Sequence, residues 1–307
     1  MRYWATVNDV SSKTVPSSPS EQRVSFSERL IAKKNKRKKR LRPWAFYTFL
    51  IIFLSILTYS IYQVYTWSLD NKHTKELTKE LADDIKPIKN DSEGELVNPP
   101  KEDDKENDYW YYTSLPFYEV DFTKLKEKNS DTIAFIHMFE TNINYPVVQT
   151  TNNEYYLSRS YDKTKNAAGW VFMDYRNNID NLSDNTVIYG HGRLDKTVFG
   201  SLKNALNKSW QNNKDNYIIW LSTEKENMMF QIFSIYTIEK ESYYIETNFK
   251  TTKDKETWLN TMQSRNQGIK TTTVSTSDKI LTLSTCENAY GGRIVVQAKL
   301  IKRQIKE

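Results

Sequence analysis

Covalent chemistry in this chain is most plausible at one cysteine with an arginine close behind it. Cys286 is the only cysteine in 307 residues and ends an apolar, alternating run that begins at Lys279. A single thiol cannot form an internal disulfide, so either packing or reactivity accounts for it. Arg293 follows seven residues later, after Gly291-Gly292, and opens a second strand-like run. We expect two neighbouring strands that present a thiol and a guanidinium from adjacent ends.

His191 is the histidine best placed to serve such a thiol. It lies between Gly190 and Gly192, directly after the apolar stretch Val187–Tyr189. Glycine permits the close approach of another chain or a substrate. Four of the eight glycines, at 190, 192, 291 and 292, flank His191 or precede Arg293. A lone cysteine at the end of an apolar strand is often merely buried, but this clustering favours a catalytic site.

The other two histidines have weaker contexts. His73 lies in a stretch rich in lysine and glutamate, and we expect it to be solvated. His137 lies in the strand-like run Ile133–Phe139 without a flanking glycine, and we expect a structural role. One cysteine and three scattered histidines do not have the ligand spacing of a zinc site. We therefore expect no metal and no cofactor.

The chemistry available to these residues is acyl transfer. The thiolate of Cys286 is the nucleophile, although an ordinary thiol is only a few per cent ionised at pH 7. His191 would take the proton and return it to the leaving amine. The planar guanidinium of Arg293 would hold a substrate carbonyl or the developing oxyanion. No motif marks an acidic residue that orients His191; Asp174 is a candidate, but a structural role fits it better.

Several motifs resemble those of the sortases, membrane-anchored cysteine transpeptidases of Gram-positive cell surfaces. They are Thr282-Leu283-Ser284-Thr285-Cys286 followed by Arg293, and Val187-Ile188-Tyr189-Gly190-His191-Gly192. Two further segments are similar to the class B branch: Ile143–Gln149 and Val171–Asn177. The resemblance covers roughly residues 115–303, and its motifs keep the family order. The stretch between Cys286 and Arg293 is short, which departs from the family pattern.

The resemblance implies a mainly β fold, an eight-stranded barrel with a few helices. A helix around residues 252–265 matches the extra helix of class B. The implied substrate is a secreted protein whose C-terminal sorting signal is cleaved after threonine. An amine of the peptidoglycan precursor would then accept the acyl group. We also expect Ser284 and Thr285, next to the thiol, to bind substrate.

Local patterns agree with a β fold from residue 109 to 307. Short runs rich in β-branched and aromatic residues alternate with polar turns. We predict strands at 145–149, 170–173, 186–189, 217–221, 228–238, 280–285 and 294–301. Phe199–Leu206 and Thr257–Met262 have helical spacing, the latter with Trp258, Leu259 and Met262 on one face. Strands at this spacing favour a closed barrel.

The first 108 residues have a different organisation. Residues 1–42 form a polar tail that ends in the basic block Lys33–Arg42, and residues 43–67 contain no charge. An apolar stretch of this length can span a bilayer, and Trp44 and Trp67 suit its interfaces. The positive-inside rule predicts a cytoplasmic tail, a transmembrane signal anchor at 43–67, an extracellular stalk at 68–108 and an extracellular catalytic domain at 109–307.

Alternatives to this topology are weaker. A cleaved signal peptide would have a shorter and earlier apolar region followed by small residues. The basic block and the net charge of +6, with a pI near 9.0, could suggest nucleic acid binding. The position of the block beside the apolar stretch instead predicts contact with anionic lipid headgroups and no nucleic acid partner.

Two rival functions stay open at this stage. The enzyme could polymerise pilin subunits with a lysine side chain as acceptor, although dedicated pilin polymerases resemble a different class with a C-terminal membrane segment. The charged C-terminal residues Lys299–Arg303 do not form such a segment. The domain could also be a non-catalytic surface-binding barrel with a buried cysteine.

Overall fold

The computed structural model describes residues 43–82, 85–87, 94–270, 272–286 and 292–306. The chain divides into two compact units, residues 1–60 and 61–307. The cytoplasmic tail expected at 1–42 lies outside the described residues.

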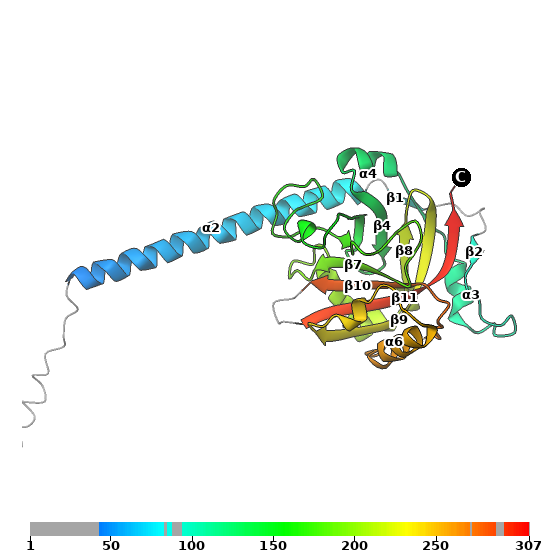
Figure 1. The fold of residues 1–307 in the computed structure, drawn as a ribbon. Coiled ribbons are helices and arrows are strands. Elements are labelled where there is room, and N and C mark those ends of the chain that lie inside the picture. Colours follow the sequence, from blue (N-terminus) through cyan, green and yellow to red (C-terminus); the bar gives the residue numbers. More distant parts are fainter. Residues whose placement is uncertain (1–42, 83–84, 88–93, 271, 287–291, 307) are drawn as a thin grey trace, which may run out of the picture. The chain divides into compact units, whose positions relative to one another are not determined.

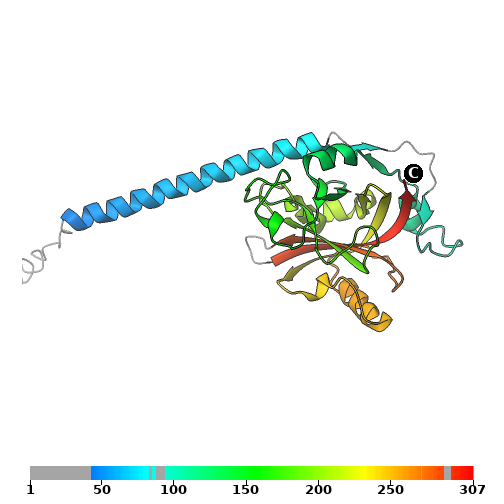
Figure 2. The same cartoon turned by 45° about the horizontal axis from the view of Figure 1, so that its top comes forward.

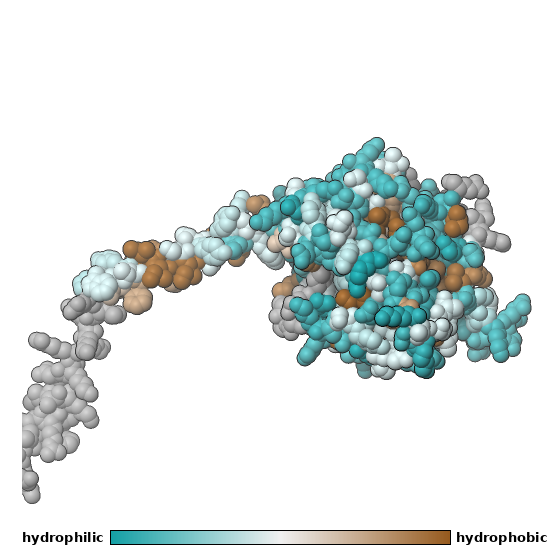
Figure 3. Space-filling model, viewed as in Figure 1, coloured by the Kyte–Doolittle hydropathy of each residue, from teal (hydrophilic) through white to brown (hydrophobic). Residues whose placement is uncertain are grey.

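Helix α2 (Pro43–Ala82) contains the apolar stretch. Its large side chains from Phe46 to Trp67 are exposed, for example Phe53 at 61%, and Figure 3 shows a brown hydrophobic band over part of the helix. An apolar surface on an isolated helix costs free energy in water and suits the interior of a bilayer. By length and composition this helix could cross a membrane.

The larger unit is built on a closed β-barrel (Figure 1). In the described part of the chain, eight strands follow one another around the ring in the order β10, β7, β6, β5, β4, β8, β9, β11, and β10–β11 pairing closes it. The strands are β4 (Thr132–Met138), β5 (Asn144–Val148), β6 (Phe172–Met173), β7 (Asn185–His191), β8 (Ile218–Ser222), β9 (Glu226–Glu239), β10 (Ile280–Cys286) and β11 (Gly292–Ile305). The expected barrel is therefore confirmed.

Strand β10 pairs with a neighbouring strand on each of its sides, which closes the ring. It pairs in parallel with β7 and antiparallel with β11. Strands β9 and β11, each 14 residues long, pair along most of their length with two register shifts. Such irregularities bend strands and help a sheet to close. Apolar side chains from all sides of the ring, such as Ile188, Phe230 and Val296, fill the core.

Helices and helical turns lie around the barrel (Figure 2). They are α3 (Asp108–Thr113), α4 (Phe122–Lys128), η1 (Tyr155–Leu157), η2 (Gly200–Leu206), α5 (Lys208–Gln211), η3 (Lys214–Tyr217), η4 (Tyr243–Ile245) and α6 (Thr252–Ser264). A capping box between Thr251 and Asp254 starts α6. Trp258, Leu259 and Met262 are buried as predicted, in a second core against the barrel.

The helical spacing at Phe199–Leu206 forms a 3₁₀ helix, η2, that begins at Gly200. A Cβ at Gly200 would lie only 2.1 Å from the carbonyl oxygen of Arg193. The backbone passes so close to Arg193 at this point that no side chain fits.

Residues 68–108, where we expected a stalk, contribute several elements to the larger unit. The last turns of α2 bury Thr74 and Leu81. β1 (Ile85–Pro87) pairs with β3 (Tyr118–Val120), and β2 (Glu95–Leu96) pairs with β11. Parts of this segment are therefore folded against the larger unit, while residues 101–106 are exposed.

Candidate active site

The register of two parallel strands sets the centre of the site. Along β7 and β10 the Cα partners run from Asn185 with Ile280 to His191 with Cys286. Parallel partners lie one strand spacing apart, about 4.8 Å. The fold therefore brings the backbone positions of the candidate nucleophile and the candidate base side by side, although 95 residues separate them in the sequence.

The imidazole of His191 is held by a carbonyl group. Its Nε2 lies 2.8 Å from the oxygen of Leu157, at the end of η1. A carbonyl can only accept, so Nε2 carries the proton and Nδ1 is the basic nitrogen of the neutral ring. Burial lowers the pKa of His191 below 6.5, against the raising effect of the Leu157 hydrogen bond. The neutral ring, which can take a proton, is therefore the main form at pH 7.

Gly169 lies close to the same edge of the ring. Its φ of +61° is in the left-handed region, and a Cβ there would lie 2.8 Å from Cδ2 of His191. The same Cβ would lie 2.7 and 2.9 Å from the carbonyl oxygens of Tyr156 and Leu157. Only glycine fits this position without displacing the ring or the carbonyl that orients it.

Arg293 is linked to the cysteine strand through a buried tyrosine. Its NH1 donates to the hydroxyl of Tyr244 at 2.9 Å, and that hydroxyl lies 2.9 Å from Oγ of Ser284. The β10–β11 register pairs Ser284 with Val295. Arg293 lies two residues before Val295 on β11, and Cys286 lies two residues after Ser284 on β10. The sequence-predicted thiol, imidazole and guanidinium residues thus lie on three adjacent strands at one end of the barrel.

The backbone around Tyr244 is held at several points. Asn185 Nδ2 donates to the carbonyl oxygens of Tyr244 and Glu246 at 3.3 and 2.9 Å. Trp258 Nε1 donates to Tyr243 O at 2.9 Å. A guanidinium bonded to a fixed, buried hydroxyl loses little further freedom when a substrate binds. The position of Tyr244 therefore bears directly on that of Arg293.

Ser284 and Thr285, expected to bind substrate, are both buried. Besides its contact with Tyr244, Ser284 donates to Thr285 O at 3.3 Å. Thr285 Oγ1 accepts a hydrogen bond from Ile294 N at 2.8 Å. Both hydroxyls thus join strands and loops around the site, and their substrate-binding role stays a prediction.

Asp174 does not orient His191 through any contact seen here. Its carboxylate accepts hydrogen bonds from Arg176, Tyr189 and Asn153. Burial would raise its pKa, but the hydrogen bonds from Arg176 bring the pKa below the ordinary value. Arg176 also donates to Ile245 O at 2.9 Å. Asp174 therefore fixes Arg176, which holds the Tyr244 segment.

The remaining histidines lie in different surroundings. His137 is packed against the rings of Tyr118, Phe139 and Trp220, with centroid separations of 4.9, 5.1 and 5.7 Å. Burial lowers its pKa, and its Nδ1 lies 3.1 Å from Asn144 Oδ1. His73, on α2, forms a 2.9 Å contact with Asp162.

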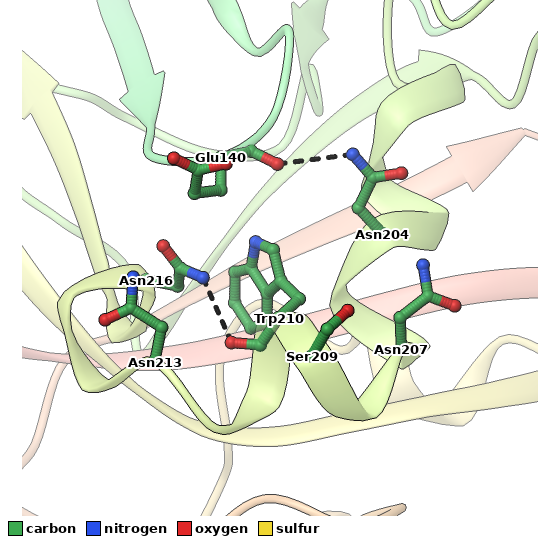
Figure 4. Close-up of a pocket in the computed structure, with 7 residues that line it drawn as sticks. All are labelled: Glu140, Asn204, Asn207, Ser209, Trp210, Asn213 and Asn216. Carbon is green, nitrogen blue, oxygen red and sulfur yellow. Dashed lines mark hydrogen bonds between the residues drawn. The ribbon is translucent and has the colours of Figure 1, made fainter.

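The described residues contain no cluster of three or more His, Cys, Asp or Glu side chains suited to a metal ion. A polar hollow of about 330 Å³ lies in another part of the unit (Figure 4). It is lined by Glu140, Asn204, Asn207, Ser209, Trp210, Asn213 and Asn216. Two of its amides bond to backbone oxygens, Asn204 to Glu140 and Asn216 to Trp210. Because none of these residues is a thiol, an imidazole or a guanidinium, this hollow is not the catalytic centre.

Sequence reasoning missed Leu157, Gly169 and Tyr244. Leu157 acts through its backbone oxygen, so its side chain carries no signal. Gly169 precedes a predicted strand at Trp170, which marks a turn but not the ring above it. Tyr244 is one of 20 tyrosines, and only the fold brings it to Arg293. The short stretch after Cys286, residues 287–291, lies outside the described residues.

Comparisons with known proteins agree with this geometry. The sortase domain family matches residues 136–301. Sortase B of Listeria monocytogenes is 34% identical over 191 residues, which cover 58% of this chain and 73% of that protein. Sortase B of Staphylococcus aureus is 35% identical over 184 residues, 59% of this chain and 75% of its own length.

Solved structures of sortase B are also similar to this chain. A Staphylococcus aureus sortase B–substrate complex has a TM-score of 0.55 at 35% identity, covering 59% of this chain and 84% of that one. Sortase B of Bacillus anthracis in complex with AAEK1 has a TM-score of 0.60 at 30% identity, covering 76% of this chain and 99% of that one.

We predict that Gly169→Ala lowers the turnover of a substrate peptide by about tenfold or more per folded molecule, because the new methyl group displaces the His191 ring. Gly268→Ala is the matched control. Gly268 also has positive φ (+95°), but its Cβ would meet only the end of the Gln211 side chain at 2.7 Å. Both variants should lose about 1 kcal/mol or more of stability from backbone strain. Peptide cleavage assays, corrected by thermal unfolding for the folded fraction, measure the difference; equal turnover in the two variants would contradict this role of Gly169.

Proposed function

The chain belongs to the sortase family of cysteine transpeptidases, and we propose that it cleaves the C-terminal sorting signal of secreted proteins after threonine and transfers them to a cell-wall amine. The observation that carries this proposal is the β7–β10 register, which pairs His191 with Cys286. The similarity to a sortase B–substrate complex of Staphylococcus aureus supports a substrate of the same class. The acceptor rests on the family resemblance.

We assign the steps to three side chains. The thiolate of Cys286 attacks the carbonyl carbon of threonine, and Arg293 stabilises the oxyanion that forms. His191, protonated by the thiol, gives this proton to the leaving amine as the peptide bond breaks. The product is a thioester between the substrate threonine and Cys286. An incoming amine then attacks the thioester, loses a proton to His191, and releases the new amide and the thiol.

The lowered pKa of His191 is compatible with these steps. Because burial favours the neutral ring, His191 can accept the proton of the thiol. Arg293 would stabilise the negative charge that then develops on the substrate. The fixed Nε2 proton leaves Nδ1 as the nitrogen that exchanges the proton.

We further propose that α2 anchors the protein in the cell membrane as a single span, with the N-terminus in the cytoplasm and the catalytic domain outside. The basic block before the apolar stretch supports this orientation. Protease added to intact protoplasts should degrade the chain after residue 68 and leave the N-terminal tail intact. Survival of the C-terminal domain under this treatment would contradict the orientation.

We predict that His191→Ala lowers peptide turnover by a factor on the order of 10² or more, the usual loss for a general acid–base group. His137→Ala is the matched control: this histidine is also buried and also has a lowered pKa, but it lies in an aromatic cluster. It should leave the turnover of the folded fraction nearly unchanged. Equal losses in the two variants would mean that the acid–base role belongs elsewhere.

We also predict that Cys286→Ala abolishes cleavage and that the wild-type enzyme forms a thioester whose fate depends on the acceptor. Hydroxylamine should yield a hydroxamate, and an oligoglycine or diaminopimelate-type amine a new amide, both detectable by mass spectrometry. Cleavage at the full rate by Cys286→Ala, or free acid as the only product with every amine, would refute the transpeptidase mechanism. If the acyl group were transferred only to a pilin peptide with a lysine acceptor, the enzyme would assemble pili and would not attach proteins to the cell wall.

A further inference from the structure

The end of helix α2 nearest the barrel has two different faces. Asn71, Thr74 and Leu81 are buried, and Leu77 packs against the core. The spacing of these residues corresponds to one side of a helix. Lys72, Lys75, Glu76 and Lys79, on other sides, are exposed. In Figures 1 and 2 this end of α2 lies against the barrel near α4, and the ion pair of Glu80 with Lys128 joins the two helices.

The buried face of α2 contacts the turn that precedes Gly169. Asp70 Oδ2 accepts a hydrogen bond from Ala167 N at 3.0 Å. Asn166 Nδ2 lies 3.3 Å from Asp70 O and 3.2 Å from Thr74 Oγ1. Asn166 O in turn accepts a hydrogen bond from Gly169 N at 3.1 Å. Two successive hydrogen bonds, between α2 and Asn166 and between Asn166 and Gly169, therefore connect the helix with the glycine beside the His191 ring.

The same face of α2 contacts the loop that follows His191. Asn71 Oδ1 accepts a hydrogen bond from NH2 of Arg193. Nε of Arg193 donates to Thr197 Oγ1 at 3.1 Å, and Arg193 N donates to His191 O at 3.0 Å. Arg193 is only 11% exposed at its side chain. Its guanidinium is thus fixed between α2 and its own loop.

We propose that residues 70–81 of α2 position the catalytic histidine, so that the segment next to the membrane anchor belongs to the catalytic apparatus. The proposal rests on the proposed role of His191. The polar contacts of α2 reach two backbone segments next to His191: the turn before Gly169 and the loop after His191. If α2 only had to be attached to the barrel, its apolar contacts at Leu77 and Leu81 would be enough, and the polar contacts would not be needed.

The contacts with the loops beside His191 come from the C-terminal part of α2 (Pro43–Ala82), within the larger unit. Asn71, Thr74 and Asp70 are positioning residues, because they act on substrate only through His191.

The test uses the full chain in detergent micelles, with kcat and KM measured for a sorting-signal peptide. Asn71→Ala should lower kcat by about tenfold or more with KM nearly unchanged, since a small displacement of a catalytic group is costly while peptide contacts stay in place. Asn71→Asp keeps an acceptor for Arg193 and should restore most of the lost kcat. Lys72→Ala is the control: this neighbour is 72% exposed, and its contact with Glu76 is 3.8 Å, so kcat should not change.

Thermal unfolding measures the folded fraction of each variant. If Asn71→Ala does not fold, Thr74→Val, which removes the acceptor for Asn166 with little change in shape, takes its place with the same expected loss of kcat. A wild-type kcat per folded molecule, or an Asn71→Asp protein as slow as Asn71→Ala, would overturn the proposal. If these variants are normal while His191→Ala is inactive, only the role of α2 fails; a fully active His191→Ala protein would overturn both this proposal and the proposed mechanism.

Discussion

The parallel pairing of β7 with β10 is the constraint on which the site depends. This pairing is part of the closed barrel and at the same time fixes which residue of β10 lies beside His191. A shift by one residue would move Cys286 to the other face of the sheet and pair His191 with a different position. The barrel is closed, so no free edge lets β10 slide. The same hydrogen bonds therefore contribute to the stability of the fold and set the geometry of the candidate site.

A buried polar network makes this register specific. Thr282 Oγ1 donates to Asn185 Oδ1 at 2.7 Å, across the β7–β10 pair, and Gln297 Nε2 donates to Thr282 Oγ1 at 3.2 Å, across the β10–β11 pair. Asn185 then holds the backbone of Tyr244, whose hydroxyl bonds to Arg293. Buried polar groups without partners cost free energy, so a slipped strand would leave several of them unsatisfied. These hydrogen bonds thus link the register of the buried strands to the position of the Arg293 guanidinium.

Patterns in the sequence predicted what is local, and motifs predicted what the family shares. The strand runs, the burial of Trp258 on α6 and the apolar helix could be read from spacing, since periodicity reflects which face is buried. Cys286, His191 and Arg293 were predicted as the catalytic residues from their glycine-rich context and their motifs. The orienting carbonyl of Leu157 and the hydroxyl of Tyr244 could not be predicted, because they act through backbone position or tertiary contact. The charged end of α2 resembled a spacer, since small polar residues such as Asn71 and Thr74 bury a helix face without an apolar signal.

The central claim is that the fold sets residue 191 beside residue 286, and a disulfide tests it most directly. Because Cys286 is the only cysteine, the variant His191→Cys contains one possible internal pair. The expected Cα separation of about 4.8 Å is within the range that a disulfide can bridge. We predict that mild oxidation joins the two thiols within one chain, seen by mass spectrometry as the loss of both alkylation sites, while His137→Cys keeps both thiols free. Two alkylatable thiols in oxidised His191→Cys would contradict the register and, with it, the active site built on it.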